Sequence, residues 1–282
     1  MTAADVLTLA APLLWAAVAE LLGQRSGVLN IGIEGVMLVA CLCAALAAPV
    51  VGPWWAIALA AAAGAATNGL FAGVVVMGAD QVVAGTGMVL VGMGATGAVF
   101  RWVQARGFSG ALLPTLPWGA LELSAVGAVA LVALFLSQTR AGLVIRACGE
   151  NPEAVAAAGI NPVRVRVVVL LVAGALVGVG GAALVLRASG TFVEGMTAGR
   201  GFLALALVLL GRWRPLLVAL GTVLLGAATA FQFHLQGLGL AGVPYHLLLA
   251  LPYLATLVVL AVVPPDRLGG PAALGRPYRS QR

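Results

Sequence analysis

Long apolar stretches alternate with short polar interruptions along almost the whole chain. The apolar stretches lie at residues 6–24, 35–51, 54–77, 82–100, 121–137, 167–186, 201–211, 216–234 and 246–263. Most of them approach the roughly 20 residues that a helix needs to cross the hydrocarbon core of a bilayer. The stretch 201–211 is too short to cross it alone, which indicates a broken or re-entrant helix. The pattern predicts an all-α, polytopic transmembrane helical bundle of about nine segments, within a range of roughly eight to ten.

The composition agrees with a membrane protein and excludes a water-soluble domain. Of the 282 residues, 62% are hydrophobic and only 9% are charged. A soluble domain carries about 25% charged residues, so too few are present to cover a surface that faces water. We therefore treat residues 1–282 as a single transmembrane domain.

The longest polar interruption is Arg146–Arg166, with the sequence RACGENPEAVAAAGINPVRVR. Asn151 can serve as an N-cap, Pro152 suits the first helical position, and Glu153 lies where the helix dipole favours an anion. Gly159 can end the helix. These residues predict a capped helix of roughly two turns between two long apolar segments. A single small helix in such a loop suggests a segment that docks onto another protein.

The distribution of arginine predicts the orientation in the membrane. If the loop 138–166 is cytoplasmic and the segments alternate, eleven of the fifteen basic residues fall on the cytoplasmic side. Cytoplasmic loops are enriched in basic residues. We therefore expect the loop 138–166 and the tail 264–282 in the cytoplasm, and the N-terminus outside.

Two stretches, Arg25–Gly35 and Arg187–Gly201, look discontinuous. Each combines several glycines with a carboxylate and leads into an apolar segment. Non-helical backbone inside a membrane survives only where it is buried in protein or lines a wet cavity. Paired interrupted segments are a mark of transport sites, so these two stretches indicate a transport pathway.

Glu34 and Asn30 are the candidate pathway residues. Apolar neighbours surround Glu34 in the sequence, so an ionised carboxylate there needs a partner or water. Glu34 either lines the pathway or forms an ion pair, with Arg25 or another loop arginine, that fixes the broken helix. Asn30 either lines the pathway or caps the following helix. Glu20 is either an interfacial acid or part of the same cluster.

Neutral polar side chains are scattered near the predicted helices. In lipid such groups usually form hydrogen bonds between helices, and they can also line a path for an uncharged polar solute. The set comprises Asn68, Gln81, Thr86, Gln104, Gln232 and Gln236.

Small residues four positions apart suit close helix packing in lipid. Two such pairs, Gly69 with Gly73 and Gly174 with Gly178, lie inside apolar stretches. We interpret both pairs as helix-packing positions.

The residue types exclude several kinds of chemistry. All fifteen basic residues are arginine, and a P-loop ATPase or a Schiff-base enzyme needs a lysine. The three cysteines, Cys41, Cys43 and Cys148, lack metal-ligand spacing, and we interpret them as two packing residues and a loop thiol. No catalytic triad or nucleotide-binding motif is present. We expect no enzyme activity, no cofactor, no metal site and no nucleic-acid partner, since topology explains the positive charge.

Four stretches carry a resemblance to a known family. They are RSGVLNIGIEGVMLVA at 25–40, RACGENPEAVAAAGINPVRVR at 146–166, GMTAGRGFLALALVLLGRWRP at 195–215 and LPYLATLVVL at 251–260. In this order they resemble the permease subunits of ABC importers of the nucleoside and simple-sugar type. That group lies in the larger family that includes ribose and branched-chain amino-acid permeases.

The resemblance assigns a role to the polar interruption. Glu153-Ala154-Val155, separated from Gly159 by three residues, resembles the general importer loop Glu-Ala-Ala-x-x-x-Gly. Val stands in place of the second Ala, and the Ile-x-Leu-Pro that often follows is missing. The resemblance implies that a helix sits in a groove of the ATPase. Its residues would be Glu150, Asn151, Pro152, Glu153 and Gly159.

The resemblance implies the permease subunit of an importer in the inner (plasma) membrane, with nucleosides as the expected solutes and simple sugars as the alternative. The expected partners are an ABC ATPase subunit, a second homologous permease subunit, an external solute-binding lipoprotein and the lipid bilayer. A stand-alone secondary transporter is the rival class. Such a transporter usually carries more membrane-embedded acids and does not need a capped docking helix.

Overall fold

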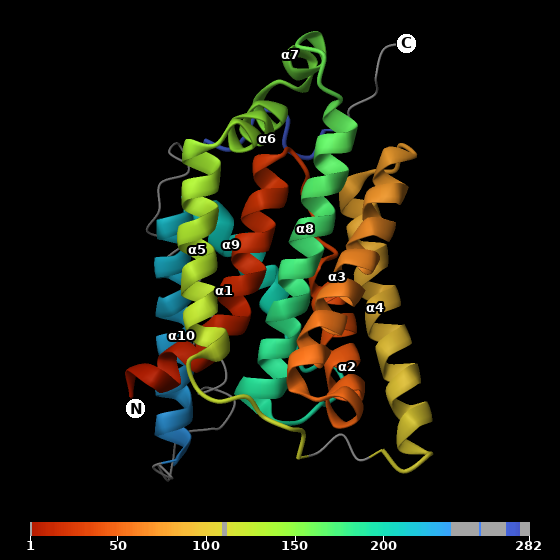
Figure 1. Ribbon diagram of the computed structural model, residues 1–282, viewed down its shortest axis with the longest axis vertical. Coiled ribbons are helices and arrows are strands. Elements are labelled where there is room, and N and C mark those ends of the chain that lie inside the picture. Colours follow the sequence, from red (N-terminus) through yellow and green to blue (C-terminus); the bar gives the residue numbers. More distant parts are fainter. Residues whose placement is uncertain (1, 109–111, 238–253, 255–268, 277–282) are drawn as a thin grey trace.

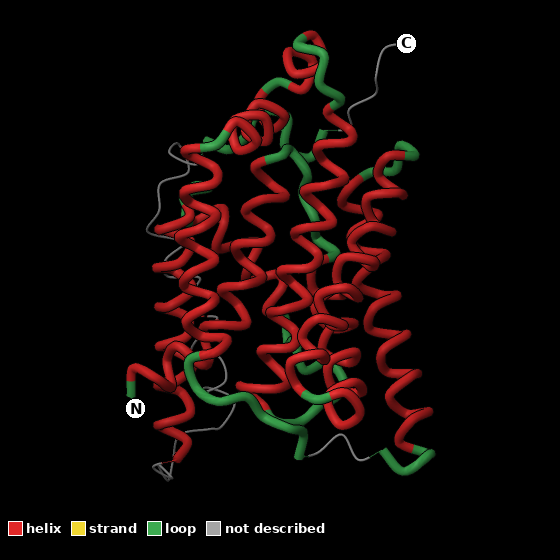
Figure 2. Tube along the Cα trace, in the orientation of Figure 1, coloured by secondary structure: helices red, strands yellow, loops and turns green. Residues whose placement is uncertain are grey.

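The computed structural model describes residues 2–108, 112–237, 254 and 269–276 of the chain. This part of the chain contains ten α-helices and one π-helix, and no strand (Figures 1 and 2). The prediction of an all-α transmembrane bundle is confirmed.

Seven of these helices are long and apolar enough to cross a membrane. Their bounds are α1 (Ala3–Arg25), α2 (Ile33–Val51), α3 (Pro53–Val76), α4 (Gln81–Gln104), α5 (Ala120–Gln138), α8 (Pro162–Ala183, continued by the π-helix η1, Leu184–Ser189) and α10 (Pro215–Gly237). The shorter helices are α6 (Arg140–Glu150), α7 (Pro152–Ala157) and α9 (Arg200–Leu210). Eight of the nine predicted segments are therefore helical, and the ninth, 246–263, lies almost entirely outside the described residues.

The long helices stand side by side, and α6 and α7 lie across one end of the bundle (Figure 1). We call this end the α7 end and the opposite one the N-terminal end, because α1 begins there. The loop between α4 and α5 runs along the N-terminal end (Figure 2). The N-terminus and the predicted docking loop thus lie at opposite ends, as the arginine count predicts.

Helix α1 forms the centre of the bundle. Every residue from Ala10 to Gln24 is buried, and α1 contacts α5, α8, α9 and α10. A helix that is apolar on all sides is buried on all sides. The outward faces of α3 and α4 keep large apolar side chains exposed, among them Leu70 and Leu90, as lipid-facing helices do.

Two helices begin inside the bundle instead of at its ends. Residues 26–32 are non-helical, and α2 begins with the buried residues Ile33 and Glu34. Residues 190–199 are also non-helical, and α9 then spans only 11 residues. At 1.5 Å per residue such a helix covers about half of the hydrocarbon core. Both predicted discontinuities are confirmed.

The closest helix packing joins α3 and α8 through glycine. A Cβ atom added to Gly174 or Gly178 would collide with the α3 backbone at Gly64 and Ala60. The pair Gly174 and Gly178 therefore packs as predicted. The other predicted pair is wrong in part, because a Cβ on Gly73 would meet no atom within 4 Å. The glycine of α3 that faces α8 most closely is Gly64.

We expect Gly174→Ala to destabilise the bundle and Gly73→Ala to leave it intact. The first substitution forces two backbones apart, and such overpacking costs about 1–3 kcal/mol. The second only removes the helix penalty of glycine, about 0.5–1 kcal/mol. Thermal unfolding of the two variants in the same detergent measures the difference. Equal midpoints would contradict the packing of α3 on α8.

Candidate functional site

The predicted docking helix is present as α7. Asn151 lies before it, and its side-chain Oδ1 accepts a hydrogen bond from the Ala154 amide at 3.0 Å. Pro152 occupies the first helical position, where its missing N–H costs nothing. Gly159 follows with φ +81°, a left-handed conformation that glycine adopts without strain. The sequence therefore encodes both ends of this helix locally.

The docking loop holds a second helix that the sequence analysis missed. Helix α6 precedes α7, and Thr139 caps it by accepting a hydrogen bond from the Gly142 amide at 2.9 Å. The prediction of a single small helix is wrong, because residues 140–150 of the same loop are also helical. The Thr139 cap was the available signal.

Helix α7 presents small and charged side chains to the outside. Glu153, Ala154 and Ala157 are exposed, whereas Val155 is buried against the bundle. Glu150, at the end of α6, accepts a hydrogen bond from the Ala272 amide at 3.2 Å. The predicted coupling residues thus lie together at the α7 end, where Glu150 and Glu153 are both exposed.

Arg166 holds the base of α6 and α7 together. Its guanidinium donates to the carbonyl oxygens of Ser26, Arg276 and Cys148, at 3.0, 3.2 and 3.5 Å. The sequence analysis placed Arg166 in the loop, but α8 begins at Pro162 and carries Arg166 into the protein, where it is buried. A buried cation is stable only where its donors find acceptors.

The segment 270–276 completes this end of the bundle. The Ala273 amide donates to Gly149 O at 2.8 Å, and the Gly275 amide donates to Gly27 O at 3.2 Å. We call the group formed by Ser26–Gly27, Cys148–Glu150, Arg166 and residues 270–276 the docking platform. It joins the end of α1, the end of α6 and the start of α8, so α7 is mounted on three helices at once.

The loop between α9 and α10 is fixed beside the docking platform. Arg25 Nε and Nη2 donate to Trp213 O at 3.1 and 2.7 Å, and Trp213 Nε1 donates to Gln24 Oε1 at 2.8 Å. Trp213 is buried with φ +54°. This strained backbone is held by contacts from α1. The loop that follows α9 is therefore attached to the end of α1.

Cys148 is a buried packing residue and not the loop thiol that the sequence suggested. It lies in α6 and is fully buried. Burial raises the pKa of its thiol, and the nearby positive charge of Arg166 opposes the shift only in part. The thiol is therefore protonated at neutral pH, and a protonated thiol is a poor nucleophile.

Glu34 joins the two broken helices. Its carboxylate accepts hydrogen bonds from the Gly199 amide at 2.8 Å and the Gly201 amide at 2.6 Å. These amides belong to the start of α9, whose first N–H groups have no partner within the helix. Glu34 itself lies in the first turn of α2. One buried carboxylate therefore faces the positive ends of two helices.

Glu34 does not form the expected ion pair with Arg25, because the Arg25 guanidinium donates to the Trp213 carbonyl instead. Asn30 is also not the predicted cap, since Gly32 occupies the N-cap of α2. The Asn30 side chain donates to Asn68 Oδ1 at 2.6 Å. Both candidate pathway residues are buried in contacts between helices.

A chain of hydrogen bonds continues from Asn30 through the bundle. Asn68 Nδ2 donates to Leu170 O at 2.6 Å, and Glu20 Oε1 accepts from Gln24 at 2.9 Å and from the Asn30 amide at 3.4 Å. Glu20 is therefore part of the Asn30 cluster and not an interfacial acid. These bonds join α1, α3 and α8 around the broken connection that precedes α2.

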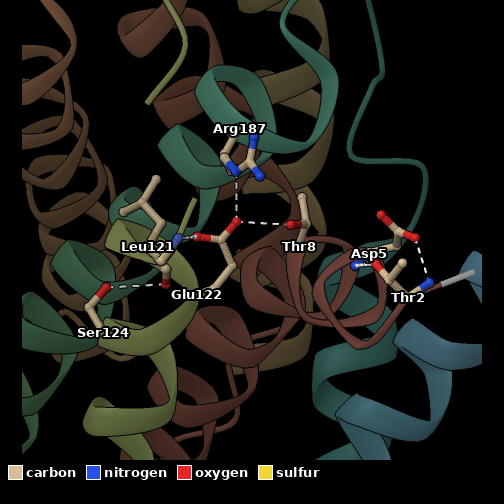
Figure 3. A network of polar contacts seen from close by, with 8 residues as sticks. Thr2, Asp5, Thr8, Leu121, Glu122, Ser124 and Arg187 are labelled. Carbon is tan, nitrogen blue, oxygen red and sulfur yellow. Dashed lines mark hydrogen bonds and ion pairs between the residues drawn. The ribbon is translucent and has the colours of Figure 1, made fainter. Parts of the chain in front are cut away.

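A second buried carboxylate, Glu122, lies at the N-terminal end. Figure 3 shows Arg187 and Thr8 converging on it. Arg187 Nε donates to Glu122 at 2.7 Å, Thr8 Oγ1 donates at 2.9 Å, and the Gly119 amide donates at 3.0 Å. The ion pair thus joins the start of α5 to η1 and α1. Sequence reasoning missed it because its members are far apart along the chain.

The described part of the chain thus combines an exposed short helix, α7, with a broken-helix junction. No group of three or more His, Cys, Asp or Glu side chains among the described residues could hold a metal ion.

Comparison with known proteins identifies the relatives of the chain. Residues 2–262 match the family model described as branched-chain amino acid transport system / permease component. The chain is 32% identical to a putative glucose ABC transporter permease protein of Haloferax volcanii, with 95% of this chain and 94% of that protein aligned.

Two further relatives carry other solutes in their names. A nucleoside ABC transporter permease protein of Lactococcus lactis is 30% identical over 92% of this chain and 90% of its own length. A guanosine ABC transporter permease protein of Bacillus subtilis is 29% identical over 96% of this chain and 94% of its own length. No solved structure matches the chain.

We expect Glu34→Ala to lower the stability of the protein much more than Glu194→Ala. The first substitution leaves the Gly199 and Gly201 amides without their acceptor, and each buried unsatisfied group costs about 1–3 kcal/mol. Glu194 forms an exposed pair with Arg101 at 2.8 Å, and such pairs contribute about 0–1 kcal/mol.

Thermal unfolding and the amount of inserted protein measure the effect. A Glu34→Ala protein as stable as Glu194→Ala would show that Glu34 does not hold the two broken helices together.

Proposed function

The chain belongs to the family of branched-chain amino acid transport system / permease components, and on that premise we propose that it moves nucleosides inward as the membrane-spanning subunit of an ABC importer. Members of this family are multi-pass membrane subunits that work with an ATPase and are not themselves catalytic. Simple sugars are the alternative solutes.

The observation that carries the coupling role is the position of α7. It is a short, capped helix at the outermost point of the α7 end (Figure 1). Its exposed Glu153, Ala154 and Ala157 leave room for a close contact with another protein. We assign Glu150, Asn151, Pro152, Glu153 and Gly159 to the contact with the ATPase subunit.

Continuous contacts lead from α7 to the broken helices. The docking platform joins α6 to the end of α1 through Arg166. Gln24 and Arg25 of α1 hold Trp213, which follows α9. The start of α9 binds Glu34 of α2. Closure of the ATPase domains would push on α7 and shift this rigid set, and a switch between two packed arrangements opens the path to one side or the other.

The names of the relatives support the solute class. Two of them are named for nucleosides or guanosine and one for glucose. All three solutes are uncharged and rich in hydroxyl groups. The two permeases of Lactococcus lactis that match this chain support a second homologous permease subunit as partner. An external solute-binding lipoprotein completes the proposed importer.

The orientation and the rival class follow from the same proposal. An ATPase works in the cytoplasm, so α7 and residues 269–276 face the cytoplasm and the N-terminus faces outward. A stand-alone secondary transporter would have no use for a capped helix on a rigid platform.

We expect Glu153→Arg to abolish nucleoside uptake without removing the protein from the membrane. The side chain is exposed, so reversing its charge costs the fold little. At an interface with another protein, a charge that meets one of the same sign costs several kcal/mol. Uptake of labelled guanosine in cells that express the complete importer measures the effect. The control is Gln104→Arg, an exposed change at the N-terminal end.

Co-purification of the ATPase subunit gives a second measurement. Glu153→Arg should lose the ATPase, and Gln104→Arg should retain it. Normal uptake and normal co-purification by Glu153→Arg would contradict the docking role of α7. Uptake of labelled pentose in place of guanosine by the wild type would favour the sugar alternative.

A further inference from the structure

Two adjoining cavities lie between α1 and α10. The outer one, of about 480 Å³, is lined at the N-terminal end by polar residues that include Asp5, Arg187 and His234. The inner one, of about 170 Å³, reaches Ala198 and Arg200 at the start of α9. Leu9 and Phe233 line both. The two cavities thus adjoin between the N-terminal end and the broken-helix junction. The outer one has the size of a small-molecule pocket, roughly 300–1,000 Å³.

Gln232 is a buried polar group without a partner in the inner cavity. Its side chain lines that cavity, and the residue is 4% exposed. Within the described part of the chain its amide forms no side-chain hydrogen bond, and the amide is not among the polar atoms that are sealed from the cavity. A buried amide without a partner is unfavourable, and this one carries both a donor and an acceptor. Its donor and acceptor are therefore available to a molecule that enters the inner cavity.

The charged groups around these cavities are already engaged. Arg187 is paired with Glu122, and Arg200 donates to the Met196 and Thr197 carbonyls at 3.1 and 3.2 Å. Asp5 accepts from the Thr2 amide at 2.7 Å. These ionised groups therefore already bind protein atoms and are not available to a charged solute.

The start of α9 is also occupied. Half-helix N-termini in transporters bind anionic substrate groups, such as a carboxylate. Here the Glu34 carboxylate accepts hydrogen bonds from the Gly199 and Gly201 amides. An amino-acid carboxylate would meet a filled site and a like charge, so this junction disfavours zwitterions and leaves neutral hydrogen-bonding groups as the available contacts.

We propose that Thr229, Gln232 and Phe233 form a binding subsite for an uncharged, hydroxyl-bearing solute, which passes from the outer cavity to the start of α9. The proposal rests on the importer function and specifies its substrate class. The Gln232 amide bonds hydroxyl or base-edge groups. Phe233, which is half exposed, offers an aromatic face on which a nucleobase stacks, and so favours nucleosides over sugars.

The first test is the kinetics of uptake by Gln232→Met in the complete importer. The substitution keeps the length of the side chain and removes its hydrogen bonds. We expect KM for guanosine to rise about tenfold, as the loss of hydrogen bonds to a ligand does, with co-purification of the ATPase unchanged. The control, Gln104→Met, makes the same change at an exposed site and leaves KM as in the wild type.

The second test needs no transport. In the Thr229→Cys variant, the introduced thiol should react with a maleimide from the N-terminal end, since Thr229 lines the inner cavity and is partly exposed. Guanosine should protect it strongly, D-glucose weakly and leucine not at all. The native Cys41 and Cys148 are buried, and labelling of the wild type gives the background.

The outcomes separate this inference from the importer function. Uptake of guanosine with an unchanged KM in Gln232→Met, or a lack of protection by both guanosine and D-glucose, overturns the subsite and leaves the importer standing. Protection by leucine overturns the substrate class. Protection by guanosine together with a wild-type complex that transports none of the three solutes overturns the proposed transport and retains the subsite.

Discussion

The start of α9 lies beside the inner cavity, and the Glu34 carboxylate accepts hydrogen bonds from two of its free amides. In a membrane every backbone polar group needs a partner within the protein. The rest of the architecture depends on this contact, because it allows two helices to start inside the bundle. Without the carboxylate, α9 would have no stable start. A continuous helix in its place would fill the space that the inner cavity occupies.

The α7 end solves a different problem, which is how to mount a small helix firmly on a bundle. Six residues cannot hold a helix by themselves, since short helices are marginal in isolation. The protein anchors α7 through a buried arginine whose donors reach three separate backbone segments. Arginine suits this task because its five donors stand in a fixed plane and it always carries its charge. The result is a stiff connection from a surface helix to α1.

Local signals in the sequence predicted much of the fold. The apolar stretches gave the long helices, because length and hydropathy alone decide what can cross a bilayer. Asn151, Pro152 and Gly159 gave both ends of α7, since capping depends on residues within a few positions. The two breaks were also visible as glycines beside a carboxylate. What sequence reasoning did not find were contacts between distant segments, such as Glu122 with Arg187 and Glu34 with Gly199 and Gly201. Many polar residues are compatible partners, and only the packing of the helices selects among them.

The docking platform also has a consequence for biosynthesis. Residues 270–276 pair with Gly27 and Gly149 and supply one of the carbonyls that bind Arg166. In the order of translation this segment follows every membrane helix described here. Until residues 270–276 have been synthesised, the docking platform beneath α7 therefore lacks this segment. The platform that supports α7 is therefore complete only after the last described helix has been synthesised.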